Sequence, residues 1–321
     1  MTLTSGDNVV STASSNADDG RKLYHAIWQL VQDNFYNRER LVQLDWPSLK
    51  HRYDRRIVDE ASALGHARRI LALLNDSYTR LMDTEEVEVK ATKREADDVF
   101  IYSHRLRENI GYLGIDDFAH TDTAEKIEAH LREISDCDAF VIDVRDNGGG
   151  MLCEATAALG LFINDAFTGY IQWQYSTGAL RRAMHMRPEH SIAHIEEDGK
   201  QPRQELFERM QALIAGKPMV VLINGATASA AEYFAAALTA SVKDGSIVSM
   251  GTKSYGKGIG QVDYPVLDKV TVKISCMRFM SPTGVWFGDA AQTVNNGIEP
   301  DFVSNCSYNT VDAVTEGANY L

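Results

Sequence analysis

The sequence predicts an α/β protein, with a mixed β-sheet core covered by helices and an N-terminal helical region before it. From about residue 99, short apolar runs alternate with amphipathic patterns, which is typical of a largely parallel or mixed sheet with helices on its faces. Before that point, apolar residues recur at helical spacing in two stretches. These are Leu23, Ile27, Leu30, Val31 and Phe35, and then Ile57, Ala61, Leu64, Ala67, Ile70, Leu71 and Leu74.

These patterns divide the chain into four expected parts. Residues 1–18 are polar and have little to bury, so we expect a disordered tail there. A helical domain over 19–90, a core over 91–310 and a C-terminal tail over 311–321 should follow. The polar region 176–204, rich in His and Arg, is expected to form a long loop or flap. The expected core strands are 99–102, 110–115, 139–144, 219–223, 246–250 and 270–275, and the expected core helices are 124–134, 154–162 and 228–238.

Composition narrows the class of partner. The net charge of −13 and the pI near 5.1 disfavour a general nucleic-acid or anionic-membrane surface. No apolar run approaches membrane-spanning length. The first residues lack the basic start and apolar core of a secretory signal, so we expect a cytoplasmic protein if the chain is full length.

The sequence contains no motif typical of a metal site or of a disulfide framework. The four cysteines are widely spaced and form no CxxC pair, so we expect buried free thiols. The nine histidines show no HExxH or similar ligand spacing. We therefore predict no metal site, and no cofactor is expected.

The first segment that departs from ordinary core sequence is VIDVRDNGGGM, residues 141–151. It predicts a buried strand that ends in a glycine-rich turn before a helix. Glycines allow positive φ and close approach of the backbone to a ligand, and amides at a helix N-terminus favour anions. A tight strand–helix turn would need only one or two glycines, so three in a row favour a functional loop.

The second segment is VLINGATASAAEYFAAAL, residues 221–238, where a strand again leads through a glycine turn into a helix. Ser229 lies at the mouth of that helix, where a hydroxyl most often serves as an N-cap. The helix after it consists almost entirely of small residues, which leaves room for a substrate beside Ser229. The amide of Ala230 would lie next to the hydroxyl, as an oxyanion donor should.

The third segment is GTKSYGKGIGQ, residues 251–261, which places Lys257 between glycines. Taken alone, it fits the GxxxxGK of a phosphate-binding loop, but Gly258 stands where the magnesium-binding hydroxyl belongs. A serine nucleophile needs a base, and no His lies near these segments, so Lys257 is the candidate. The lysine must be neutral, which requires burial. Gln261 could orient its amine without the negative charge that Asp263 would add.

At these residues the chain resembles the C-terminal processing peptidases, also called tail-specific proteases, whose DLRNNxGG-like, SASASE-like and TFGKGxxQ-like motifs occur in the same order. Here they read DVRDNGGG, TASAAE and SYGKGIGQ. The resemblance extends over about residues 20–305, through NDSYTRLMDTEE at 75–86, IGYLGIDDF at 110–118 and NNGIEPDFV at 295–303. It implies a crotonase/ClpP-like fold and a serine endopeptidase that acts on protein or peptide substrates through a Ser–Lys dyad and an acyl-enzyme.

Carried over by position, the resemblance makes Ser229 the nucleophile, Lys257 the general base and Gln261 the orienting residue. Ala230 together with Gly150 or its neighbour Gly149 would form the oxyanion hole. The interval between Glu86 and Ile110 is too short for the PDZ domain that many members carry, so the chain resembles a PDZ-less member. The resemblance also makes a homo-oligomer plausible.

Two other functions stay open on the sequence. A crotonase-like acyl-CoA hydratase or isomerase would share the fold and use oxyanion amides with carboxylates, but it would have no need of Lys257 and Gln261. A non-catalytic peptide-binding homologue would keep the fold without turnover.

Overall fold

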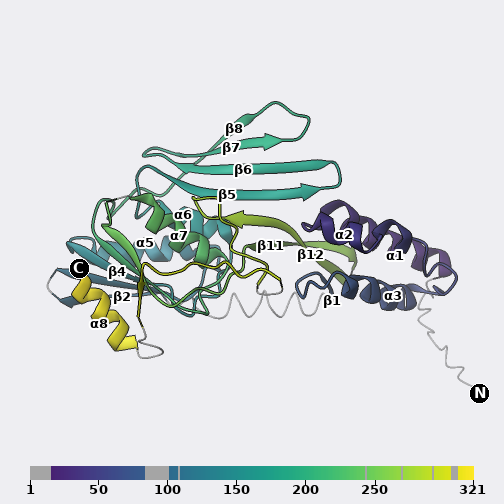
Figure 1. Cartoon of the computed structure of the whole chain (residues 1–321), viewed down its shortest axis with the longest axis horizontal. Coiled ribbons are helices and arrows are strands. Elements are labelled where there is room, and N and C mark those ends of the chain that lie inside the picture. The colour runs from purple at the N-terminus through teal and green to yellow at the C-terminus, as the bar shows by residue number, and fades with distance from the viewer. Residues whose placement is uncertain are drawn as a thin grey trace, which may run out of the picture.

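The computed structural model describes residues 16–83, 101–107, 109–242, 244–268, 270–290, 293–304 and 310–321 (Figure 1). These residues form a mixed α/β fold with a six-stranded and a seven-stranded sheet. This confirms the predicted fold class. Most of the expected tail over 1–18 lies outside the described residues. Residues 84–100, which include the end of the segment 75–86, lie outside them as well.

The six-stranded sheet forms the centre of the predicted core. Its strand order is β13 (Phe302–Val303), β10 (Ile247–Gly251), β9 (Met219–Ile223), β4 (Ala139–Asp143), β3 (Ile110–Ile115) and β2 (Ile101–Arg107). All neighbouring pairs are parallel except β2 with β3. Strands β4 and β9 are buried along their whole length, which explains their uninterrupted apolar sequences.

Helices cover both faces of this sheet. On one face, α5 (Thr123–Ile134), α6 (Leu152–Leu159) and α7 (Ala230–Ser241) share a hydrophobic core with the sheet. On the other face, Val314 and Ala318 of α8 (Thr310–Tyr320) pack against Val141 and Val220. Residues 311–321, which we expected as a C-terminal tail, therefore lie almost entirely in a packed helix.

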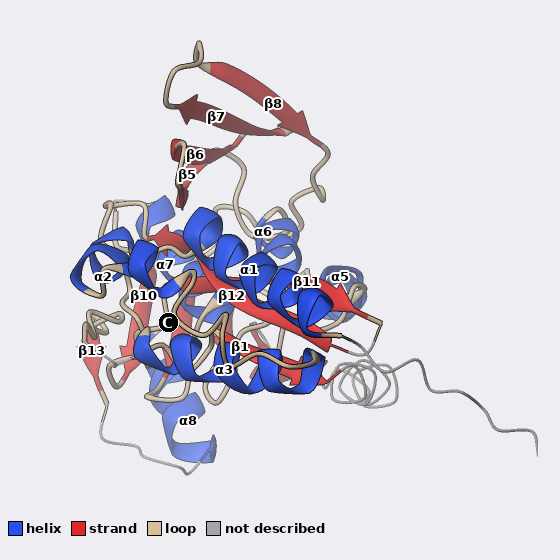
Figure 2. Ribbon diagram, turned by 90° about the vertical axis from the view of Figure 1, so that its right-hand side faces the viewer, coloured by secondary structure: helices blue, strands red, loops and turns tan. Residues whose placement is uncertain are grey.

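The expectation of a loop over 176–204 is wrong. Here β5 (Ala166–Tyr175), β6 (Gly178–Met186), β7 (Ser191–Glu197) and β8 (Arg203–Phe207) form consecutive antiparallel pairs. Strand β5 pairs with β12, and the strands after it extend away from the body of the molecule, with β8 outermost (Figures 1 and 2). Most side chains of β5 and β6 are only partly buried on either face, so their sequences lack the apolar alternation that marks a half-buried strand.

The N-terminal helices pack against the other end of the seven-stranded sheet. This region contains α1 (Ala17–Asn34), α2 (Arg38–Gln43), a 3₁₀ turn (Trp46–Leu49) and α3 (Glu60–Leu73), followed by β1 (Arg80–Asp83). Strand β1 pairs with β12 (Val270–Met280), which in turn pairs with β11 (Ile259–Leu267). Leu23 and Ile70 share one core with Ile259 and Val272. The helical region and the strand that follows Lys257 are thus packed as a unit.

The described cysteines differ in burial. Cys137 and Cys276 are buried free thiols as expected, whereas Cys153 is exposed. Within the described ranges, no helix combines the length and the apolar character needed to cross a bilayer.

Candidate active site

The three segments singled out in the sequence follow three adjacent parallel strands. Residues 144–151 follow β4, residues 224–229 follow β9 and residues 252–258 follow β10. Because parallel strands end at the same edge of a sheet, the three turns meet there. The carboxyl edge of such a sheet is the usual place for a ligand in α/β proteins.

Side chains bind the glycine turn to the turn that carries Ser229. The Asn224 side chain accepts a hydrogen bond from the Asp146 amide at 3.0 Å and donates one to the Asp146 carboxylate at 3.0 Å. The Thr227 hydroxyl donates to the Val144 carbonyl at 2.8 Å. These bonds satisfy polar groups in both turns and fix their relative position.

Ser229 occupies the N-cap of α7 with a φ of 60° and a ψ of −121°. Positive φ is unfavourable for a residue with a side chain, and such strain is concentrated at functional sites. The backbone of the glycine turn lies directly against this residue. A Cβ on Gly149, whose φ is +92°, would be 2.6 Å from both the Ala228 carbonyl oxygen and Ser229 Cβ. Only glycine allows this approach.

The candidate oxyanion donors differ in whether their N–H groups are already used. The Gly149 amide donates to Asn147 Oδ1 at 2.9 Å. The amides of Gly150 and Ala230 carry no hydrogen bond within the described part of the chain. Ala230 is the first residue of α7, whose amide has no intrahelical acceptor. Gly150 and Ala230 therefore present the free donors beside Ser229.

Lys257 is half-buried in the third turn, with its Nζ 4.4 Å from the centre of the Tyr78 ring. Burial lowers the pKa of Lys257 below its usual value, and the nearby charge of Lys273 lowers it further. The carboxylates of Glu232 and Asp76 oppose this shift. The structure thus places a partly desolvated lysine at the edge where Ser229 lies, with two acidic residues, Glu232 and Asp76, close enough to oppose the lowering of its pKa.

The structure does not pair the predicted catalytic groups through a direct hydrogen bond. Among the described residues, none joins Ser229 Oγ to Lys257 Nζ, and none joins Gln261 to Lys257. The Gln261 amide instead donates to the Ile259 carbonyl at 3.4 Å and to Ser275 Oγ at 3.3 Å. The register between β11 and β12 shifts between Gly260 and Gln261, where the pairing skips Cys276, and Gln261 lies opposite Ser275.

A buried carboxylate, Glu232, joins the two turns at their backbones. Its Oε2 accepts hydrogen bonds from the amides of Ser229 and Lys257, each at 2.8 Å. Its Oε1 accepts from Ser254 Oγ at 2.6 Å and from the Gly256 amide at 2.7 Å. One side chain thereby holds the nucleophile candidate and the base candidate to the same atom.

Sequence reasoning missed Glu232 as a site residue, although a signal was present. Glu232 stands three residues after Ser229, the spacing at which an acidic side chain reaches back to the N-cap amide. Burial raises the pKa of Glu232, and its hydrogen bonds with Ser254, Lys257, Gly256 and Ser229 oppose that rise. Three backbone N–H groups can only donate, so the arrangement suits the ionised carboxylate.

A cavity of about 280 Å³ adjoins the lysine turn. Tyr36, Asp76 and Asp289 are among its lining residues. Asp289 forms a backbone bridge with Lys257, and Asp76 lies two residues before Tyr78, whose ring the lysine covers. The cavity is therefore connected to the lysine turn through Asp76 and Asp289, while Lys257 itself is not among its lining residues.

One solved structure with a similar fold is titled photosystem II D1 C-terminal processing protease. The match covers 89% of this chain and 93% of that chain, with a TM-score of 0.66 and 16% sequence identity. The model of peptidase family S41 matches residues 109–304. The chain therefore belongs to peptidase family S41.

Curated relatives agree with this family. The carboxy-terminal processing protease CtpA of Bacillus subtilis is 29% identical over 187 residues, which are 58% of this chain and 34% of that protein. A probable CtpA-like serine protease of Staphylococcus epidermidis is 27% identical over 245 residues, 74% of this chain and 42% of its own. The chain thus spans well under half the length of these two relatives.

Proposed function

We propose that this chain is a serine endopeptidase that cleaves protein or peptide substrates through a Ser–Lys dyad. Ser229 is the nucleophile, Lys257 is the general base, and the amides of Gly150 and Ala230 are the oxyanion donors. The Bacillus subtilis relative is named a carboxy-terminal processing protease and the Staphylococcus epidermidis relative a probable serine protease, which supports proteins or peptides as the substrate class. Gly149 supports the site through its close packing against Ser229.

The observation that carries this proposal is the shared hydrogen bonding of Ser229 and Lys257 to one oxygen of Glu232. A helix cap alone has no need of a lysine turn, and a glycine-rich turn alone has no need of the serine. Glu232 fixes the backbones of both residues, while their side chains are left to turn toward a bound substrate. Catalytic hydrogen bonds often tighten only when substrate is present.

The proposed reaction balances protons through one amine. Neutral Lys257 Nζ takes the proton of Ser229 Oγ as that oxygen bonds to the scissile carbonyl carbon, and the negative charge moves to the carbonyl oxygen. The amides of Gly150 and Ala230 stabilise that oxyanion. The lysine then gives its proton to the leaving nitrogen as the C–N bond breaks. The same amine then takes a proton from water as the water oxygen bonds to the acyl carbon, and the lysine returns that proton to Ser229 Oγ as the ester bond breaks and the carboxylic acid leaves.

We also propose that Gln261 orients the amine of Lys257 when a substrate is bound. Its amide contacts Ser275 and the Ile259 carbonyl, so orienting Lys257 would require the side chain to rotate away from both. Gln261→Ala should then lower kcat and leave the KM for peptide nearly unchanged. Equal kcat values in the variant and the wild type would exclude the role.

The direct test is cleavage of a defined peptide mixture by the whole chain, read by mass spectrometry, beside labelling with a peptidyl phosphonate. We expect discrete cleavage products and one phosphonate adduct that maps to Ser229. Labelled protein should no longer cleave. Wild-type protein that neither cleaves nor reacts would support the non-catalytic peptide-binding alternative, and turnover of acyl-CoA by Lys257→Ala would support the crotonase-like one.

Cleavage should depend on pH through the amine of Lys257. The neutral amine is the active form, so kcat/KM should rise as pH increases through its pKa, and burial places that pKa below the value of free lysine. Because the charge of Lys273 lowers the pKa of Lys257, Lys273→Gln should move the midpoint to higher pH. A pH profile that is flat, or that Lys273→Gln leaves in place, would contradict Lys257 as the base.

A further inference from the structure

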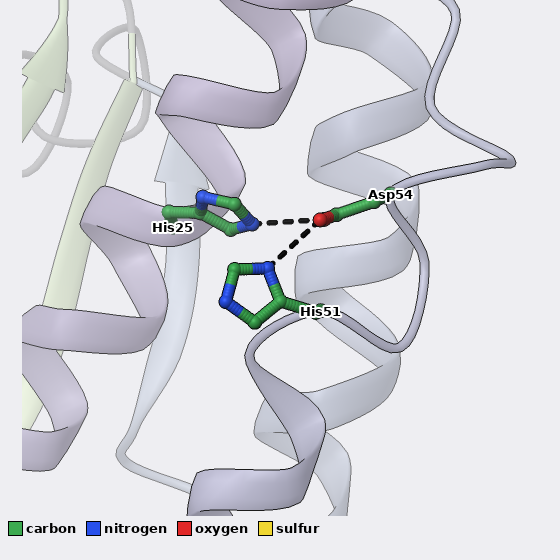
Figure 3. A group of neighbouring side chains, drawn as sticks. All are labelled: His25, His51 and Asp54. Carbon is green, nitrogen blue, oxygen red and sulfur yellow. Dashed lines mark hydrogen bonds and ion pairs between the residues drawn. The ribbon is translucent and has the colours of Figure 1, made fainter.

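Two histidines and an aspartate converge in the N-terminal helical region, apart from the proposed catalytic turns. His25 lies within α1, and His51 and Asp54 lie in the turns after the 3₁₀ segment (Figure 3). His25 Nε2 is 2.8 Å from Asp54 Oδ1, and His51 Nδ1 is 2.8 Å from Asp54 Oδ2. One ligand atom from each residue lies within 4.8 Å of the others.

We propose that His25, His51 and Asp54 form a site for a divalent transition-metal cation, with Zn²⁺ as the fitting ion. Imidazole nitrogen and carboxylate oxygen are the zinc ligands that this group offers, at bond lengths of about 2.0–2.2 Å. Three protein ligands leave one tetrahedral position for water or another ligand. Mg²⁺ and Ca²⁺ prefer oxygen ligands, so two imidazoles disfavour them.

The surrounding structure holds two of the ligands in place. Tyr24, next to His25, is fully buried and donates its hydroxyl to the Leu49 carbonyl at 2.7 Å. The Tyr24 ring meets the Tyr53 ring edge-on at a centroid distance of 6.1 Å, and Tyr53 precedes Asp54. His25 and Asp54 are therefore attached to packed neighbours on both sides of the site, so ordering them for a cation costs little conformational entropy.

The third ligand is placed to adjust and to admit the ion. The His51 side chain is 67% exposed, against 27% for His25 and 28% for Asp54. Its ring lies edge-on to that of His25 at a centroid distance of 4.8 Å. A small rotation of this exposed ring can close the triad around a cation, which replaces the two protons now shared between the imidazoles and the carboxylate.

Sequence patterns gave no sign of this site. His25 and Asp54 are 29 positions apart, and no short motif contains both. Only the packing of α1 against the turns at 51–56 brings them together, so the expectation of no metal site rested on spacing along the chain alone.

The test uses the full chain after chelator treatment, with Zn²⁺ binding measured by calorimetry and bound metal counted after desalting. Wild-type protein should bind one equivalent that His51→Ala and Asp54→Asn lose by at least about 100-fold in affinity. His194→Ala removes an exposed histidine on β7 and should bind as the wild type does. Because His51 is largely exposed, its alanine variant should stay folded, which circular dichroism checks.

Two further readings separate a metal site from a simple hydrogen-bonded cluster. Co²⁺ in place of Zn²⁺ should give the visible absorption of a four-coordinate ion in the wild type and not in His51→Ala. Zn²⁺ should raise the melting temperature of the wild type but not of that variant. Zinc affinity equal in His51→Ala and the wild type, or no binding by either, would overturn the proposal and leave only a His–Asp–His hydrogen-bonded cluster.

Discussion

Replacing Ser229 with alanine or Lys257 with methionine should each lower kcat for peptide cleavage by about 10³-fold or more. Alanine removes the oxygen that forms the acyl-enzyme, and methionine keeps much of the lysine's volume while removing the amine that accepts its proton. Residues that act as a unit lose activity together. The double variant should therefore be no slower than the slower single variant, by steady-state kinetics on a cleaved peptide.

Lys253 supplies the matched control for this experiment. It lies in the same loop after β10 and forms a surface ion pair with Glu299 at 2.7 Å. Lys253→Met should cleave peptide at nearly the wild-type rate, because exposed pairs contribute little. Wild-type activity in Ser229→Ala or Lys257→Met would remove the dyad from consideration. A loss in Lys253→Met equal to that in Lys257→Met would show that the loop, and not one amine, is what the chemistry needs.

Glu232→Ala should both destabilise the protein and abolish cleavage. It leaves the amides of Ser229, Gly256 and Lys257 and the Ser254 hydroxyl without their acceptor in a buried place. Unsatisfied buried donors and broken buried carboxylate networks cost about 3–5 kcal/mol in all. Urea unfolding of the variant and the wild type measures this change in the free energy of unfolding.

Glu232→Gln separates the charge of this residue from its shape. The glutamine side chain keeps one acceptor oxygen, but its NH₂ group replaces the other and faces groups that can themselves only donate. Activity should therefore fall even if the variant still folds. The Glu232 carboxylate raises the pKa of Lys257, so its loss should move the residual pH–activity profile to lower pH. An unchanged profile with reduced stability would make Glu232 a purely structural residue.

The core of the fold could be predicted because its signals are local. Strands β3 and β9 have the bounds expected from their apolar runs, and the three turns were visible from glycines at strand ends. A fully buried strand that leads into a glycine turn and a helix leaves few alternative structures. The catalytic candidates follow from the same turns, since each stands within a few residues of a strand end.

The other features of the fold and of the site depend on contacts between distant parts of the chain, which no local sequence pattern indicates. The Tyr78 ring beneath Lys257 comes from the other end of the chain, and it meets the lysine only because β1 pairs with β12. Strands β5 and β6 escaped notice because water reaches both of their faces. Gln261 lies opposite Ser275 and donates to it because the pairing of β11 with β12 is irregular there. The sequence of one strand does not indicate such an irregularity in its pairing with another.

If Lys257 is the general base, the packing of the N-terminal helices against β11 and β12 makes its strength depend on two distant parts of the chain. The Lys257 amine lies over the Tyr78 ring, Tyr78 packs against the core that the helices share with β11 and β12, and burial is the largest cause of the lowered pKa of Lys257. In the proposed mechanism, displacement of those helices would let water reach the amine and raise its pKa, while Ser229 and the proposed oxyanion donors stayed in place. Docking of the N-terminal region would then be a condition for the proposed turnover, because it limits the access of water to Lys257.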